Sequence, residues 1–160
     1  MSHSLDPREL RNAFGAFATG ITVITTKGRD GNDYGLTANS FSSVSLDPPL
    51  LLWCLGKQTD CYDAFQNAEY YAVHILADTQ QDLSNTFASK GADKFAGLNV
   101  ERGPGDIPML SGAVTRFVCK SAHQYPGGDH IIHVGEVMAV SSAEGKPLLF
   151  HKGKYETLAE

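Results

Sequence analysis

The sharpest change in the pattern of polar and apolar positions falls near residue 50. Residues 35–49 read GLTANSFSSVSLDPP, and residues 50–55 read LLLWCL. A polar segment rich in Ser and Thr therefore runs directly into a strand that we expect to be buried on both faces. Because a buried donor without a partner costs about 1–3 kcal/mol, the polar segment must either face water or hold a polar ligand.

The rest of the pattern predicts a mainly β chain with flanking helices. The first helix is predicted by an Asp6 N-cap that is followed by a proline and Glu9. Apolar residues then recur at helical spacing. The predicted helices are 6–18, 59–68 and 79–88. β-Branched and apolar runs predict six or seven strands, among them 21–26, a strand from Tyr34 to 41 that completes a hairpin, 50–55, 70–76, 113–123, 131–140 and a closing segment over 147–158.

The order of these elements limits the architecture. Pro48 and Pro49 cannot lie inside a sheet, and residues 89–112 are predicted to be irregular. Because the strands are mostly adjacent in sequence, we expect an antiparallel barrel with helices packed outside it, in a single domain over residues 1–160.

Composition and charge exclude several classes of protein. The formal net charge is −5 and no basic run occurs, which argues against a nucleic-acid partner. No apolar run approaches the roughly 20 residues of a membrane span, and MSHSLDPREL has no signal-peptide core, so we expect a cytoplasmic protein. The three cysteines and six histidines lack metal-binding spacing, so no metal site is expected.

The polar segment over residues 37–45 is a candidate binding site. The chain contains no G-x-G-x-x-G, no P-loop and no G-x-S-x-G motif. An extended backbone nevertheless offers alternating N–H and C=O groups that match the polar edge of a flavin ring. Asn39 can donate or accept a hydrogen bond there. A Ser-rich surface loop has the same composition, and the pattern leaves both interpretations open.

Three other segments carry candidate chemistry, each with a purely structural alternative. Thr59 begins a helix near Lys57, which suits an anion or a simple helix cap. Lys90 and Lys94 follow a helix and either neutralise a phosphate or coat the surface. The sequence GGDH at 127–130 permits close approach of a ligand, with an Asp that orients the histidine, or forms only a hairpin turn.

Five segments in order carry a resemblance to a known family: AFGAFATGITVITT, GLTANSFSSVSLDPPLLLWCL, FASKGADKFAG, GGDHIIHVGEV and PLLFHKGKY. This order resembles the short-chain flavin reductases, the reductase components of two-component flavin-dependent monooxygenases. The resemblance covers about residues 8–157, and its most specific pieces are TANSFSSVSLDPPL and GDHxIxxGEV.

The resemblance implies a fold and an activity. The implied fold is the FMN-binding split β-barrel, an antiparallel barrel of Greek-key type, in a homodimer. The implied activity is reduction of FMN or FAD by NADH or NADPH, with the reduced flavin passed to a separate monooxygenase.

The resemblance also implies site residues by position. The flavin pyrimidine edge would be lined by Thr37, Ala38, Asn39 and Ser40, and the reactive ring nitrogen would be approached by Ser42 and Ser43. The ribityl and phosphate region would be held by Cys54, Lys57 and Thr59. The phosphate, or the adenylate of FAD, would be reached by Ser89, Lys90 and Phe95. The nicotinamide would contact His130, and the pocket would be bordered by Phe150 and Tyr155.

Hydride transfer depends mainly on orientation of the two cofactors, so Ser42, Ser43 and His130 are assigned positioning roles. A different class of function is a flavin-binding carrier or sensor without turnover, for which the GGDH loop would be unnecessary. A third is an oxidase with tightly bound flavin, which would need a basic substrate pocket. The five arginines are scattered along the sequence and form no such cluster.

Overall fold

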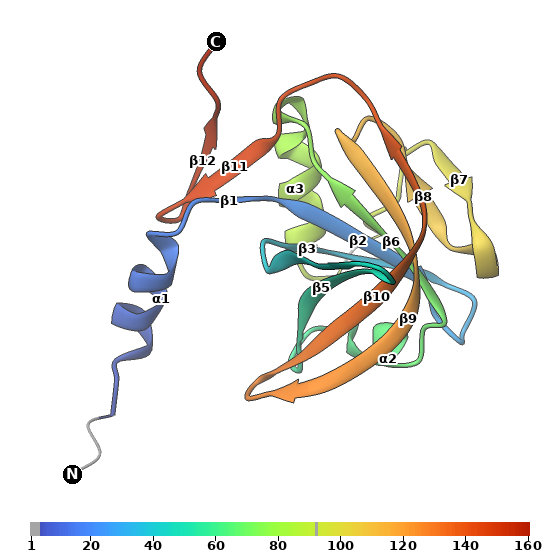
Figure 1. Ribbon diagram of the computed structural model, residues 1–160, viewed down its shortest axis with the longest axis horizontal. Helices are drawn as coiled ribbons and strands as arrows, with labels where there is room; N and C mark the ends of the chain where they lie inside the picture. The colour runs from blue at the N-terminus through green and yellow to red at the C-terminus, as the bar shows by residue number, and fades with distance from the viewer. Residues whose placement is uncertain (1–3, 92) are drawn as a thin grey trace.

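The computed structural model describes residues 4–91 and 93–160 as a mainly β structure with few helices (Figure 1). The helices are α1 (Pro7–Gly15), α2 (Tyr62–Gln66) and α3 (Gln81–Ala88), with 3-10 turns η1 (Asp78–Gln80) and η2 (Pro104–Asp106). The strands are β1 (Thr19–Gly20), β2 (Thr22–Lys27), β3 (Asp33–Ala38), β4 (Phe41–Leu46), β5 (Pro49–Gly56), β6 (Tyr70–Ile75), β7 (Val100–Arg102), β8 (Pro108–Leu110), β9 (Thr115–Gly127), β10 (His130–Ser142), β11 (Leu148–His151) and β12 (Lys154–Thr157).

One seven-stranded sheet dominates the fold, in the order β3-β2-β6-β9-β10-β5-β4. Smaller sheets have the orders β1-β11-β12 and β7-β8, and the strand pairs of all three sheets run antiparallel. The two edge strands β3 and β4 are consecutive in sequence and are joined only by Asn39 and Ser40. Since two residues span only a few ångströms, the sheet must curl until its edges approach each other.

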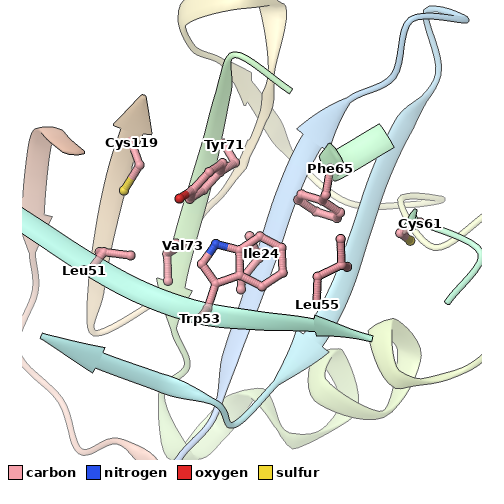
Figure 2. Close-up of a cluster of buried hydrophobic side chains, with 9 residues drawn as sticks. All are labelled: Ile24, Leu51, Trp53, Leu55, Cys61, Phe65, Tyr71, Val73 and Cys119. Atoms are coloured by element: carbon pink, nitrogen blue, oxygen red, sulfur yellow. The ribbon is translucent and has the colours of Figure 1, made fainter. Parts of the chain in front are cut away.

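The core fills the inside of this curl, around Trp53 of β5 (Figure 2). The Trp53 ring lies 5.0 Å from the ring of Phe65, 5.6 Å from Tyr71 and 4.8 Å from His133, between ring centroids. All four side chains are completely buried. Gly135 of β10 passes so close to this cluster that a Cβ there would overlap the Tyr71 hydroxyl.

The structure confirms the antiparallel, mainly β prediction and corrects three details. Only alternate residues of β5 are buried, Leu51, Trp53 and Leu55, so the expectation of burial on both faces is wrong. An antiparallel sheet with one face toward the core alternates in this way. Twelve strands occur in the described part of the chain, not six or seven. The additional strands include β4 within the polar segment and the β7–β8 hairpin within the segment that we expected to be irregular.

Helix α1, the β11–β12 hairpin and the tip of the β9–β10 hairpin extend away from the curled sheet (Figure 1). The β9–β10 hairpin has 13 residues in each strand and turns at Gly128 and Asp129, a tighter connection than we expected. Helix α1 begins after the predicted Asp6 N-cap, but none of its residues is buried. Within residues 4–91 and 93–160, the structure has no helix with the length and apolarity needed to cross a membrane.

Candidate active site

A cavity of about 460 Å³ opens beside the two approaching edges of the sheet. Four segments form its wall: residues 36–40, which end β3 and lead to β4; residues of the β5 end and the following turn; the C-terminal end of α3 with the loop after it; and His130. The volume lies in the range of about 300–1,000 Å³ that is typical of small-molecule sites.

The β3 wall is fixed by side chains that bond to neighbouring backbone. The Thr37 hydroxyl donates to the Ser84 carbonyl of α3 at 2.7 Å, and the Thr22 hydroxyl donates to the Ala38 carbonyl at 2.6 Å. Helix α3 packs closely because residue 35 is glycine, where a Cβ would lie 2.6 Å from the Phe87 ring. As an edge strand, β3 keeps backbone N–H and C=O groups that no strand pairs, and these are available to a ligand.

Ser40 and Cys54 form the adjoining wall. The Ser40 hydroxyl accepts a hydrogen bond from the Cys54 N–H at 3.1 Å and donates to the Cys54 carbonyl at 3.3 Å, so it extends the β4–β5 pairing through a side chain. Burial raises the pKa of the Cys54 thiol. The thiol therefore stays protonated near neutral pH and acts as a small wall group, not a nucleophile.

The opposite end of the cavity gathers hydroxyl and ammonium groups. Thr59 and Ser89 line it, with Lys90 and Lys94 beside them. The Ser89 hydroxyl donates to the Thr86 carbonyl at 2.6 Å. Among the lining residues Asp60 is the single carboxylate, so two ammonium groups outnumber it. This end of the cavity therefore suits an anionic ligand group.

His130 lines the cavity at the base of the β9–β10 turn. Its Nδ1 lies 2.7 Å from Oδ1 of Asp129, and the hydrogen bond from His130 lowers the pKa of Asp129. Because an ionised carboxylate only accepts, Nδ1 carries the proton and Nε2 is left for a ligand. A glycine at position 56 brings β5 close to this ring, since a Cβ there would lie 3.6 Å from Nε2.

Comparisons with known proteins agree on one family. Residues 14–159 match the family described as flavin reductase like domain. The chain is 42% identical over 148 residues to the FMN reductase (NADH) SmoA of Agrobacterium fabrum, covering 92% of this chain and 84% of that protein.

The chain belongs to this flavin reductase family.

Two further members are similar over nearly the whole chain. The reductase component of the flavin-dependent trigonelline monooxygenase of Acinetobacter baylyi is 43% identical over 96% of this chain. The structure of the NADH:FAD oxidoreductase SgcE6 of Streptomyces globisporus, in complex with NAD and FAD fragments, superimposes with a TM-score of 0.89 at 35% identity, covering 99% of this chain and 98% of that one. The chain spans only 49% of the length of the trigonelline relative, and about half to two thirds of the first curated relatives.

The structure brings most of the predicted flavin reductase residues together in the cavity. These are Thr37, Ala38, Asn39, Ser40, Cys54, Thr59, Ser89, Lys90 and His130. The sequence interpretation assigned no role to Gln58, Asp60 or Phe87, which also line it. Phe87 lies near the end of α3, and Gln58 and Asp60 lie in a polar turn, so the sequence around them gives no sign of a cavity. The cavity becomes visible only when α3 packs on β3.

The other predicted residues lie outside this cavity. Ser42 and Ser43 are exposed on β4, and the Ser42 hydroxyl donates only to the Ser43 carbonyl at 2.9 Å. Lys57 is exposed and contacts the Asp129 carbonyl through its backbone N–H.

Three aromatic predictions fall around the cavity and not in it. Phe150 lines a neighbouring groove of about 690 Å³ that shares Asn39 with the cavity. Phe95 lines a smaller cavity of about 210 Å³ on the other side. The Tyr155 hydroxyl bonds to the Ser84 hydroxyl at 2.7 Å and to Oδ1 of Asn85 at 3.0 Å, so it ties β12 to α3.

Proposed function

We propose that this protein is an NAD(P)H-dependent flavin reductase that transfers a hydride from a nicotinamide cofactor to FMN or FAD and supplies the reduced flavin to a separate monooxygenase. Family membership supports the proposal, as do relatives named for FMN, for FAD with NADH, and for a monooxygenase.

One observation carries the proposal: a single cavity joins an edge strand with unpaired backbone groups to an end rich in ammonium and hydroxyl groups. A flavin nucleotide has the matching parts, a planar ring with a polar edge and a phosphate. The residues present therefore fit the group that the family implies. Thr37 to Asn39 would hold the ring edge, while Thr59, Ser89 and a lysine ammonium group beside them would hold the phosphate.

The chemistry of the reaction belongs to the cofactors, because a bound flavin accepts the hydride at its ring nitrogen. The part of the protein is to orient the reactants. His130, whose Nδ1 is bonded to Asp129, would contact the nicotinamide with Nε2. We keep the positioning roles of Ser42 and Ser43 as predictions, although both side chains face outward on β4 of the single chain.

The proposed assembly is a homodimer. A nine-residue helix is too short to be stable by itself in water, yet α1 buries no residue against its own chain. Phe14 and Phe17 are 70% and 79% exposed, and Leu46 of β4 is 96% exposed. A second copy that covers these side chains would stabilise α1. Sedimentation should then give the mass of two chains, and a monomer at micromolar concentration would contradict this assembly.

The finer description of the fold is also part of the proposal. The curl of the seven-stranded sheet, with its edges joined by two residues, supports the split β-barrel. A single domain over residues 1–160 and a cytoplasmic location stay predictions.

Anaerobic mixing with NADH or NADPH and a large excess of FMN or FAD tests the function. We expect a catalytic amount of protein to bleach the flavin absorbance over many turnovers, which also requires that the flavin exchanges. Bleaching limited to one equivalent would indicate a tightly bound flavin. Saturable flavin binding without any bleaching would indicate a carrier or sensor instead.

A further inference from the structure

Two lysines follow α3, and the fold holds them differently. Lys90 is exposed and makes no hydrogen bond or ion pair with another described residue. Lys94 is half-buried, and its ammonium donates to the Gly35 carbonyl of β3 at 3.2 Å and to the Phe87 carbonyl of α3 at 3.3 Å. The position of the Lys94 charge is therefore fixed by two elements of the cavity wall.

The end of α3 explains why a fixed charge matters at this place. The last carbonyls of a helix lack partners within it and carry a partial negative charge. The last turn of α3 contains no basic residue, and Phe87, Ala88 and Ser89 all line the cavity. An anion that enters here meets the unfavourable end of a helix. Lys94 offsets the partial negative charge of that helix end, because its ammonium donates a hydrogen bond to the Phe87 carbonyl.

The Lys94 ammonium also has capacity left for a ligand. It has three donors, and the two carbonyls use two of them. Lys94 lines both the 460 Å³ cavity and the adjoining 210 Å³ cavity, so it lies where they meet. Asp60 lines the same junction, but no ion pair among the described residues involves Lys94.

We propose that Lys94 is the fixed cation of the flavin phosphate subsite: it offsets the negative end of α3 and donates its remaining N–H to the terminal phosphate. This inference rests on the proposed function and adds to it, because it assigns the phosphate contact to the anchored lysine in preference to exposed Lys90.

The test compares FMN with riboflavin, which has the same ring but no phosphate. The dissociation constants of both are measured by flavin fluorescence for the wild type, Lys94→Gln, Lys94→Arg and Lys90→Gln. We expect Lys94→Gln to weaken FMN by about tenfold to a hundredfold, the size of one charged hydrogen bond, and to change riboflavin by less than about twofold. Lys94→Arg should restore most of the FMN affinity.

Lys120→Gln on β9 is the matched control, since it removes the same charge from an exposed position outside the described cavities. Equal weakening of FMN and riboflavin in Lys94→Gln would show a merely structural role and overturn the proposal. If Lys94→Gln does not fold, the comparison of Lys94→Arg with Lys90→Gln tests the proposal. A tenfold loss of FMN affinity in Lys90→Gln would place the phosphate cation at Lys90 and overturn it. Failure of the proposed function would be seen separately, as a wild-type protein that binds neither flavin.

Discussion

Residues 37–40 and 41–46 both carry serine or threonine hydroxyls, yet these hydroxyls lie in different surroundings. The first segment lines the cavity, and Ser40 bonds to both backbone groups of Cys54. The second segment is edge strand β4, in which Ser42 bonds only to the carbonyl of the next residue. The comparison teaches that the position of a hydroxyl in the sheet topology, and not the density of hydroxyls in the sequence, decides which of them can reach a ligand.

Acid should produce the largest loss of stability among these tests, because both segments depend on a core that contains neutral histidines. Burial lowers the pKa of His74 and of His133 to about 4. His74 uses Nδ1 to donate to the Val23 carbonyl and Nε2 to accept from the Leu110 N–H, so a second ring proton has no acceptor. The unfolded chain therefore binds more protons than the folded chain between pH 6.5 and 4, and stability falls as the pH falls through this range.

Each histidine is expected to reduce the free energy of unfolding by roughly 3 kcal/mol by pH 4. Urea unfolding from pH 8 to pH 4 measures this loss. A flat profile below pH 6.5 would contradict neutral burial of the two rings.

Ser40→Ala should have the next largest effect. The substitution leaves a partly buried N–H and C=O of Cys54 without their partner, which costs about 2 kcal/mol. Chemical denaturation at pH 7 measures the change. Because serine does not titrate, the difference from the wild type should persist at pH 5. A loss below about 0.5 kcal/mol would mean that Ser40 is no more important than the serines of β4.

His130→Ala tests the end of the cavity at the β9–β10 turn. We expect the KM for the nicotinamide cofactor to rise about tenfold, as for one lost hydrogen bond, while the dissociation constant of FMN changes by less than about twofold. Steady-state kinetics and fluorescence titration give the two numbers. Wild-type kinetics in this variant would remove His130 from the site.

Ser42→Ala and Ser43→Ala should have the smallest effects. Both side chains are exposed, so each substitution should change stability by less than about 0.5 kcal/mol and leave flavin affinity unchanged. The same titrations and denaturation curves serve here. At saturating flavin, a fall of kcat in either variant would support the positioning role that the family resemblance implies, and an unchanged kcat would remove that role.

Elements with local signals were predicted well from the sequence. The Asp6 cap with proline after it marks the start of α1, and the β-branched run with its glycine turn marks the β2–β3 hairpin. Strand β4 was missed because Ser has little preference for strands, and pairing with β5 alone makes it extended. The alternation of β5 was missed because leucine on a partly exposed face looks like leucine in the core.

The candidate site was predictable where a motif is local and unpredictable where the fold joins distant residues. GGDH and the Thr37–Ser40 segment stand out in the sequence, and the structure brings them to one cavity. The contacts of Lys94 with Gly35 and Phe87 could not be predicted, because they depend on how the loop after α3 folds back against β3. The hydrogen bonds of the Tyr155 hydroxyl to α3 could not be predicted either, because they depend on how β12 packs against that helix.

Hydrogen–deuterium exchange with and without FMN tests the central claim most directly, that the cavity beside residues 37–40 binds a flavin nucleotide. Saturating FMN should slow exchange in residues 36–40, 58–60 and 87–90, which line the cavity, and leave residues 42–46 of β4 unchanged. Protection confined to β4, or no protection in any of these segments, would contradict the account.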